Sequence, residues 1–89
     1  MPPYDIQPTP NPNSLKFMAR DTLFDVPAMV TGSTPEEAGG NELAMRLLSI
    51  DGIANVFIVP QFLTITKSPG VEWDDLLPSV EELIASQLA

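Results

Sequence analysis

The sequence predicts a two-layer α+β sandwich, in which an antiparallel sheet carries two helices on one face. Three observations support this fold class. Two pairs of short strand-like segments each surround a tight loop, two segments have helical periodicity, and the order is strand, strand, helix, strand, strand, helix. The 89 residues, 44% of them hydrophobic, suffice for one ordinary core, so we expect residues 1–89 to form a single domain.

The first hairpin is predicted around a loop rich in proline and asparagine. The three prolines within residues 8–13 remove backbone donors and favour extended geometry in the residues before them, as is typical of a turn. Residues 4–7 and 14–20 are the candidate strands on either side. In the second strand, side chains alternate with the period of two expected of a half-buried strand. Residues 21–30 are ambiguous, and within them residues 22–26 are compatible with a short edge strand before Pro27.

The first helix is predicted to begin at a capping box over residues 34–37. This box has Thr at the N-cap, Pro at the first helical position and Glu three residues after the cap. Two glycines follow and weaken the helix by about 1 kcal/mol each relative to alanine. Asn41 is expected to cap a second start, for a helix over residues 42–50 that ends before Gly52.

The second hairpin, residues 53–59 and 62–67, gives the strongest strand signal. Pro60 excludes a type I′ turn, so a type I turn in a slightly longer loop is expected. If Val59 pairs with Phe62, one face of the hairpin is aliphatic and forms the core side: Ala54, Val56, Ile58, Leu63 and Ile65. The other face combines polar groups with aromatic rings near the hairpin tip: Asn55, Phe57, Val59, Phe62, Thr64 and Thr66.

The last helix is predicted over residues 73–88, where apolar side chains recur at spacings of three and four. Pro78 is tolerated only near a helix start, so the regular helix is expected to begin near Asp74 or Asp75. Those two carboxylates then lie in its first turn, where negative charge interacts favourably with the helix dipole.

The composition excludes several classes of function. The chain has no Cys and no His, which removes thiolate and imidazole ligands as well as the usual nucleophiles and bases. Four cations against 12 carboxylates give a net charge of −8, which argues against nucleic acid as a partner. No serine has a histidine to activate it, and no glycine-rich loop precedes a helix in a phosphate-binding pattern. We therefore expect no enzyme, no catalytic residue and no cofactor.

The sequence contains no recognisable targeting signal. It starts without the basic and apolar segments of a secretory signal, and its longest purely apolar run covers only residues 56–60. A membrane span needs roughly 20 such residues. We therefore expect a cytoplasmic, monomeric protein without membrane contact.

A series of short motifs runs along nearly the whole chain. Residues 9–17 read Thr-Pro-Asn-Pro-Asn-Ser-Leu-Lys-Phe, and residues 34–38 read Thr-Pro-Glu-Glu-Ala. Further motifs follow in order within residues 43–52, 56–67 and 73–78. Together they resemble the N-terminal domain of Nfu-type (NifU-like) iron–sulfur scaffold proteins, and the resemblance covers roughly residues 7–85.

The resemblance implies the same fold and a place in iron–sulfur cluster assembly. In the longer relatives a separate C-terminal domain holds the cluster through Cys-x-x-Cys, and this chain has no Cys. The resemblance therefore implies a free-standing copy of the accessory domain. Our leading hypothesis is a non-catalytic interaction module of cluster assembly or delivery that docks to a scaffold, carrier or apo-client protein.

The alternative hypothesis is a protein that binds iron ions directly through surface carboxylates. Its candidate clusters lack the spacing of a calcium loop. Adjacent carboxylates on a helix also point about 100° apart, so a solvated acidic face is the better interpretation and no metal ligand is assigned. The clusters are Glu36/Glu37, Asp21/Asp25, Glu72 with Asp74/Asp75, and Glu81/Glu82.

The candidate partner-binding residues fall into two groups. Lys16, Met18 and Arg20 share one strand face, which we expect to continue into the face that carries Phe57 and Phe62. A surface that combines basic and aromatic groups is typical of a partner site. The alternative is that the rings are buried by the N-terminal segment or by a bulge that exchanges the sheet faces.

The second group lies in the proline-rich loop. Asn11 and Asn13 carry amides that both donate and accept hydrogen bonds, which suits a recognition loop. The alternative interpretation is that these residues serve only the turn, since Asn and Pro are both good turn formers.

Overall fold

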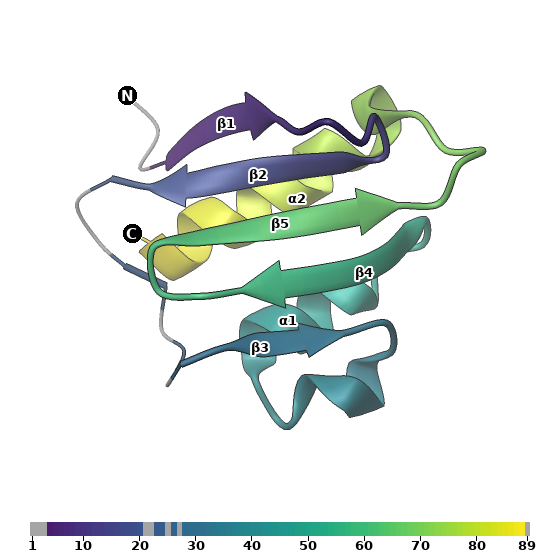
Figure 1. Cartoon of the computed structure of the whole chain (residues 1–89). Coiled ribbons are helices and arrows are strands. Elements are labelled where there is room, and N and C mark those ends of the chain that lie inside the picture. The colour runs from purple at the N-terminus through teal and green to yellow at the C-terminus, as the bar shows by residue number, and fades with distance from the viewer. Residues whose placement is uncertain (1–3, 21–22, 25, 27, 89) are drawn as a thin grey trace.

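The computed structural model describes residues 4–20, 23–24, 26 and 28–88. Its strands form one antiparallel sheet in the order β1-β2-β5-β4-β3, and both α-helices lie on one face of it (Figure 1). The elements are β1 Tyr4–Pro8, β2 Ser14–Ala19, β3 Val30–Gly32, α1 Glu42–Leu48, β4 Ile53–Ile58, β5 Phe62–Lys67 and α2 Trp73–Leu88. The two-layer α+β fold predicted from periodicity is confirmed.

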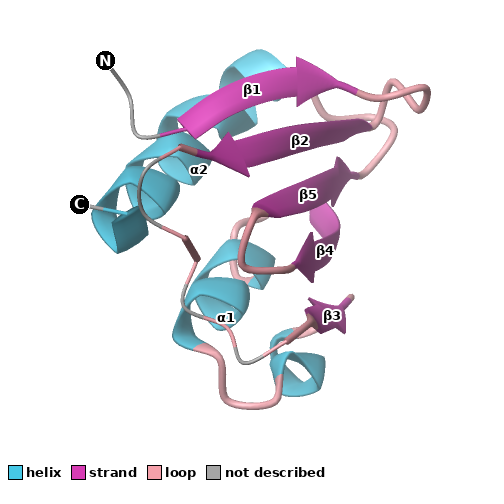
Figure 2. Ribbon diagram, turned by 60° about the vertical axis from the view of Figure 1, so that its left-hand side comes forward, coloured by secondary structure: helices cyan, strands magenta, loops and turns pink. Residues whose placement is uncertain are grey.

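The two helices divide the covered side of the sheet between them. In Figure 1, α2 lies behind β1, β2 and β5, whereas α1 lies behind β4 and β3. Figure 2 shows the same helix layer from the side, with the other face of the sheet left without a helix. The phenol of Tyr4 ties β1 to α2 by donating a hydrogen bond of 2.7 Å to Glu81 Oε1.

The core lies between the helices and the sheet. Phe17, Leu63 and Ile65 point from the central strands toward the helices and are fully buried. Val80 and Ile84 of α2 are fully buried as well. The aliphatic face of the second hairpin is therefore the core side, as its pattern predicted.

One predicted member of the core face is wrong. Val56 to Ile58 pair with β5 in the expected register, but the pairing shifts between Ile53 and Asn55. A β-bulge inserts an extra residue and reverses the side chains beyond it. Ile53 is therefore buried, and Ala54 is only half-buried instead of lying in the core.

The sheet has an edge strand that the sequence did not predict, β3. It is only three residues long, too short for alternation to reveal. Gly32 lies against the 3-10 helix Pro35–Ala38, because a Cβ at this glycine would stand 2.8 Å from the Cβ of Glu37. The edge strand considered within residues 22–26 is not present: residues 23, 24 and 26 are outside any strand, and residues 22 and 25 lie outside the described part of the chain.

The helix boundaries differ slightly from those predicted. The capping box forms a 3-10 helix, in which the Glu37 carboxylate accepts hydrogen bonds from the backbone N–H groups of Ser33 and Thr34. Asn41 Oδ1 caps α1 as expected, but α1 ends at Leu48 and not at residue 50. Helix α2 begins at residue 73, one or two residues earlier than expected, and its exposed Pro78 lies within the second turn.

Candidate functional site

The strands leave one face of the sheet uncovered by the helices, and we call it the open face. Because side chains alternate along a strand, the registers of all the strand pairs assign its members without ambiguity. It is the face turned toward the viewer in Figure 1. The open face consists of Asp5, Gln7, Ser14, Lys16, Met18, Thr31, Asn55, Phe57, Phe62, Thr64 and Thr66.

Four side chains of the open face form an aromatic–basic cluster: Lys16, Met18, Phe57 and Phe62. The two phenylalanine rings are stacked with centroids 6.1 Å apart and planes inclined by 30°. The Lys16 ammonium lies 4.4 Å from the Phe62 ring centroid, within the range of a cation–π interaction. Met18 stands directly opposite Phe62 in the ladder, and all four side chains are half-buried.

An ion pair lies next to this cluster. Arg20 Nε donates a hydrogen bond of 3.0 Å to Asp5 Oδ2, and Arg20 Nη2 contacts the other carboxylate oxygen. This hydrogen bond with Arg20 lowers the pKa of the Asp5 carboxyl below its ordinary value. Since Asp5 is paired with Met18 across the ladder, the ion pair borders the apolar part of the open face.

The structure thus brings together five of the residues predicted to bind a partner. Lys16, Met18, Phe57 and Phe62 lie on the open face, and Arg20 follows directly after β2. The bulge that was considered as an alternative lies at the start of β4, beyond Phe57, and leaves the aromatic rings on the open face. Their role in binding stays a prediction.

The two loop asparagines lie at the other end of the strands and do not join the cluster. Asn11 Oδ1 accepts a hydrogen bond of 2.9 Å from the backbone N–H of Asn13, which closes an Asx turn. Asn13 Oδ1 accepts a hydrogen bond of 3.0 Å from Lys67 Nζ. Both side-chain carbonyls therefore hold the turn together, and a role of the two side chains in recognition stays a prediction.

Two residues that were not among the predicted site residues, Lys67 and Trp73, hold this loop by hydrogen bonds. Lys67 is buried, and its backbone N–H donates a hydrogen bond of 2.7 Å to the carbonyl of Asn13. The indole of Trp73 donates a hydrogen bond of 3.2 Å to the carbonyl of Pro12. The Lys67 ammonium also lies 6.0 Å from the Trp73 ring centroid. The sequence offered one signal for this contact: Lys67 falls on the core face of its strand, and a buried lysine needs a polar partner.

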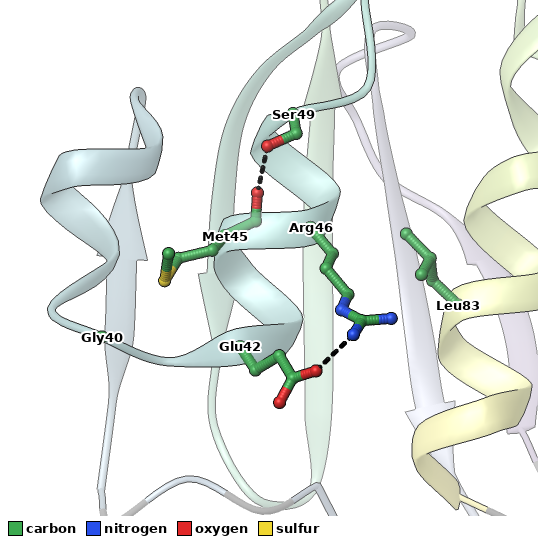
Figure 3. A pocket seen from close by; sticks show the side chains of 6 residues that line it. All are labelled: Gly40, Glu42, Met45, Arg46, Ser49 and Leu83. Atoms are coloured by element: carbon green, nitrogen blue, oxygen red, sulfur yellow. Dashed lines mark hydrogen bonds and ion pairs between the residues drawn. The ribbon is translucent and has the colours of Figure 1, made fainter.

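A second surface feature lies on the outer side of the helix layer, between α1 and α2 (Figure 3). It is a hollow of about 670 Å³ lined by Gly40, Glu42, Met45, Arg46, Ser49 and Leu83. Glu42 and Arg46 form an ion pair of 2.5 Å along α1. No prediction from the sequence included this hollow, although an exposed Met45 beside a charged pair was visible in the helical pattern.

The carboxylates of the described residues do not gather into a metal-ligating group. Within residues 4–20, 23–24, 26 and 28–88, no three side chains of the types Asp, Glu, His and Cys lie close enough to hold one ion.

The helices of this same part of the chain are all too short or too polar to cross a membrane.

Comparison with protein families gives one match along almost the full chain. The family model described as the scaffold protein Nfu/NifU N-terminal region matches residues 4–89. Among curated proteins, the chain is 41% identical over 74 residues to NifU-like protein 4, mitochondrial, of Arabidopsis thaliana. It is 39% identical over 75 residues to the human protein named NFU1 iron-sulfur cluster scaffold homolog, mitochondrial.

These relatives are much longer proteins. Each of the two alignments covers 83% of this chain but only 26% of the plant protein and 29% of the human protein. The fold is also that of a NifU-like protein from Saccharomyces cerevisiae studied in solution, with a TM-score of 0.77 and 27% identity. That likeness covers 96% of this chain and 76% of the yeast chain.

Proposed function

The chain belongs to the Nfu/NifU N-terminal family, and on that premise we propose that it is a non-catalytic interaction module of iron–sulfur cluster assembly or delivery. In this role it docks to a scaffold, a carrier or an apo-client protein. The curated relatives include a protein named as an iron–sulfur cluster scaffold homolog, which supports the pathway.

The observation that carries the docking role is the open face. The sheet presents a half-buried aromatic–basic cluster on the side that neither helix covers. Apolar groups left partly exposed beside a positive charge are typical of a surface that is completed by a partner. The fully buried apolar residues of β2, β4 and β5 all lie on the covered face, so the core closes without this cluster.

The amino-acid composition supports a role in which the partner supplies the ligands of the iron–sulfur cluster. Iron–sulfur clusters are held mainly by cysteine thiolates and in some cases by histidine, and this sequence contains neither. The module therefore contributes recognition and orientation, while the iron–sulfur cluster is cargo that the partner carries. The hydrogen-bonded β1–β2 loop and the packed core make the open face a pre-ordered surface, which lowers the entropic cost of binding.

The test is affinity purification of the tagged chain from its native cells under anaerobic conditions, followed by identification of the bound proteins. We expect an assembly factor or an iron–sulfur apo-protein to be recovered with the native chain. Lys16→Glu and Phe57→Ser should reduce this recovery, because they reverse the charge and remove a ring of the cluster. Ser79→Glu, on the exposed side of α2, is the matched control and should not reduce it.

The folded state of each variant is checked by its circular dichroism and its urea midpoint. If the native chain recovers no assembly factor or client, and iron–sulfur enzymes keep normal activity after deletion of its gene, the proposed function is wrong. Calorimetry with ferrous ion tests the alternative, direct iron binding. Saturable binding that is lost when one carboxylate cluster is neutralised would favour that alternative.

A further inference from the structure

The charges of this protein are distributed unevenly between its two faces. Every described carboxylate other than Asp5 lies in a helix, in the 3-10 helix or in a loop. The open face, together with the first residue after β2, carries Lys16 and Arg20. Among the described residues, this face therefore carries more positive than negative charge, although the chain as a whole has a net charge of −8.

No carboxylate among the described residues forms an ion pair with Lys16. Asp5 is the one acidic side chain on the described open face, and it is bound by Arg20. The contact recorded for the Lys16 ammonium is the ring of Phe62. A cation–π contact satisfies none of the three N–H donors of an ammonium fully, so these donors remain available to an acceptor from outside.

The apolar groups beside Lys16 are also incompletely covered. Phe57 flanks Thr64 on one side and Lys16 flanks it on the other, so a partner side chain placed over Thr64 reaches both. Met18 adds a flexible thioether on the same face. The surface thus combines one cation with an adjacent aromatic and aliphatic area.

From this charge complementarity we propose that the open face docks an acidic apolar segment of a partner protein. A carboxylate of the segment binds Lys16, and an adjacent aliphatic or aromatic side chain packs against Phe57 and Met18. The proposal rests on the proposed function and adds the chemical class of the partner surface. The hollow between α1 and α2, beside the Glu42–Arg46 pair, is not part of this site.

Repulsion from the acidic helix layer does not prevent this docking. The molecule measures 22 Å along its shortest axis, whereas the Debye length is about 8 Å at physiological ionic strength. The charges on the outer side of the helices are therefore largely screened at the open face. Nucleic acid fits less well, because one of the two cations is already paired with Asp5 and the strands of the described part of the chain carry no basic stripe.

The methionines provide separate reporters for the two surfaces. Met18 lies on the open face, whereas Met45 lines the hollow between the helices. The full chain is labelled with carbon-13 at its methionine methyl groups and is titrated with three probes. The probes are a short soluble peptide of Glu, Leu and Phe, the same peptide with Lys in place of Glu, and a thymidine oligonucleotide of similar length.

We expect the acidic peptide to shift the Met18 methyl signal saturably and to leave Met45 unchanged. Lys16→Glu should weaken the binding of the acidic peptide about tenfold or more and should strengthen that of the lysine peptide, because the sign of the central charge is reversed. Arg46→Glu makes the same change of charge on the helix layer and should leave both affinities unaltered. The affinity for the acidic peptide should also fall with added salt.

Several results would overturn the proposal. These are an absent Met18 shift with the acidic peptide, equal shifts with both peptides, a stronger response to the oligonucleotide, or binding that Lys16→Glu does not change. A Met18 signal that depends on protein concentration without any probe would assign the open face to a second copy of the chain. Recovery of an assembly factor in the purification experiment is independent of these titrations, so the proposed function and this inference can fail separately.

Discussion

The two faces of the sheet are built from the same strands and have opposite character. On the covered face, Phe17, Leu63 and Ile65 are fully buried against the helices. On the open face, Lys16 and Phe62, which alternate with them along β2 and β5, are only half-buried. Both faces belong to the same hydrogen-bonded strands, so the difference in burial comes from the helices, which cover only one of the two faces.

This contrast separates the residues that hold the fold from those that are free to serve recognition. Burial of apolar side chains stabilises the protein by about 25 cal/mol per Å² removed from water, so the covered face supplies most of the stability. The open face contributes less, and its side chains can be exchanged at small cost. Paired substitutions, one on each face, test this separation directly.

The largest difference is expected between two neighbours in β5. Leu63→Ala removes a fully buried side chain from the covered face and should lower the free energy of unfolding by about 2–5 kcal/mol. Phe62→Ala, one residue earlier on the open face, should cost about 1 kcal/mol, because its ring is half-exposed. Urea denaturation measures both values, provided that the dependence of the unfolding free energy on urea concentration stays the same in the variants. Equal losses would mean that the open face is part of the core.

The next difference is expected between two lysines on opposite faces. Lys67→Met removes the hydrogen bond to Asn13 Oδ1 and should destabilise the protein by about 1–3 kcal/mol, because a partly buried acceptor loses its charged donor. Lys16→Met should change the stability by less than about 0.5 kcal/mol. The urea midpoints of the two variants test this. A larger loss for Lys16 would contradict the assignment of the open face.

Tyr4 offers a pH-dependent test of the covered face. Its burial, followed by its hydrogen bond to Glu81, raises the pKa of the phenol above the ordinary value of 10.0. This contribution to stability is fully present below pH 10 and is lost as the pH rises beyond it. The native protein should therefore lose stability in alkaline solution more steeply than Tyr4→Phe, which at neutral pH should cost about 1 kcal/mol. Parallel alkaline curves for the two proteins would exclude the linkage.

The smallest effect is expected at the exposed ion pair on the open face. The hydrogen bond with Arg20 lowers the pKa of Asp5, so its contribution is present above the carboxyl's ordinary pKa and disappears as the pH falls through the lowered value. Arg20→Gln should move the Asp5 titration, followed by carboxyl carbon-13 NMR, back toward its ordinary range. Little change in the unfolding free energy should accompany it.

Much of this architecture was predictable because the alternation of side chains is a local signal. The period of two assigned the faces of β2, of β5 and of β4 from Asn55 onward correctly, and the spacing of apolar residues placed α2. The bulge that exchanges Ala54 for Ile53 was not predictable, because a one-residue insertion leaves no trace in a short apolar run. The edge strand β3 was missed for a similar reason, since its pairing with β4 is a tertiary interaction.

The candidate site was predictable only in part. The combination of Lys16, Met18, Phe57 and Phe62 followed from the faces of the strands, once the two hairpins were placed side by side. The anchoring of the loop by Lys67 and Trp73 did not, since these contacts join residues more than 50 positions apart in the chain. The hydrogen bond between Asn13 and Lys67 is therefore a structural contact that the position of Asn13 in a turn did not reveal.

Site-specific photo-crosslinking in the native cells tests the central claim most directly. A photoreactive phenylalanine derivative replaces Thr64, between Lys16 and Phe57 on the open face, or Ser49, in the hollow between the helices. We predict that the derivative at position 64 captures an iron–sulfur assembly factor or apo-protein, and that the derivative at position 49 does not. Capture of such a protein from position 49 alone would contradict the account.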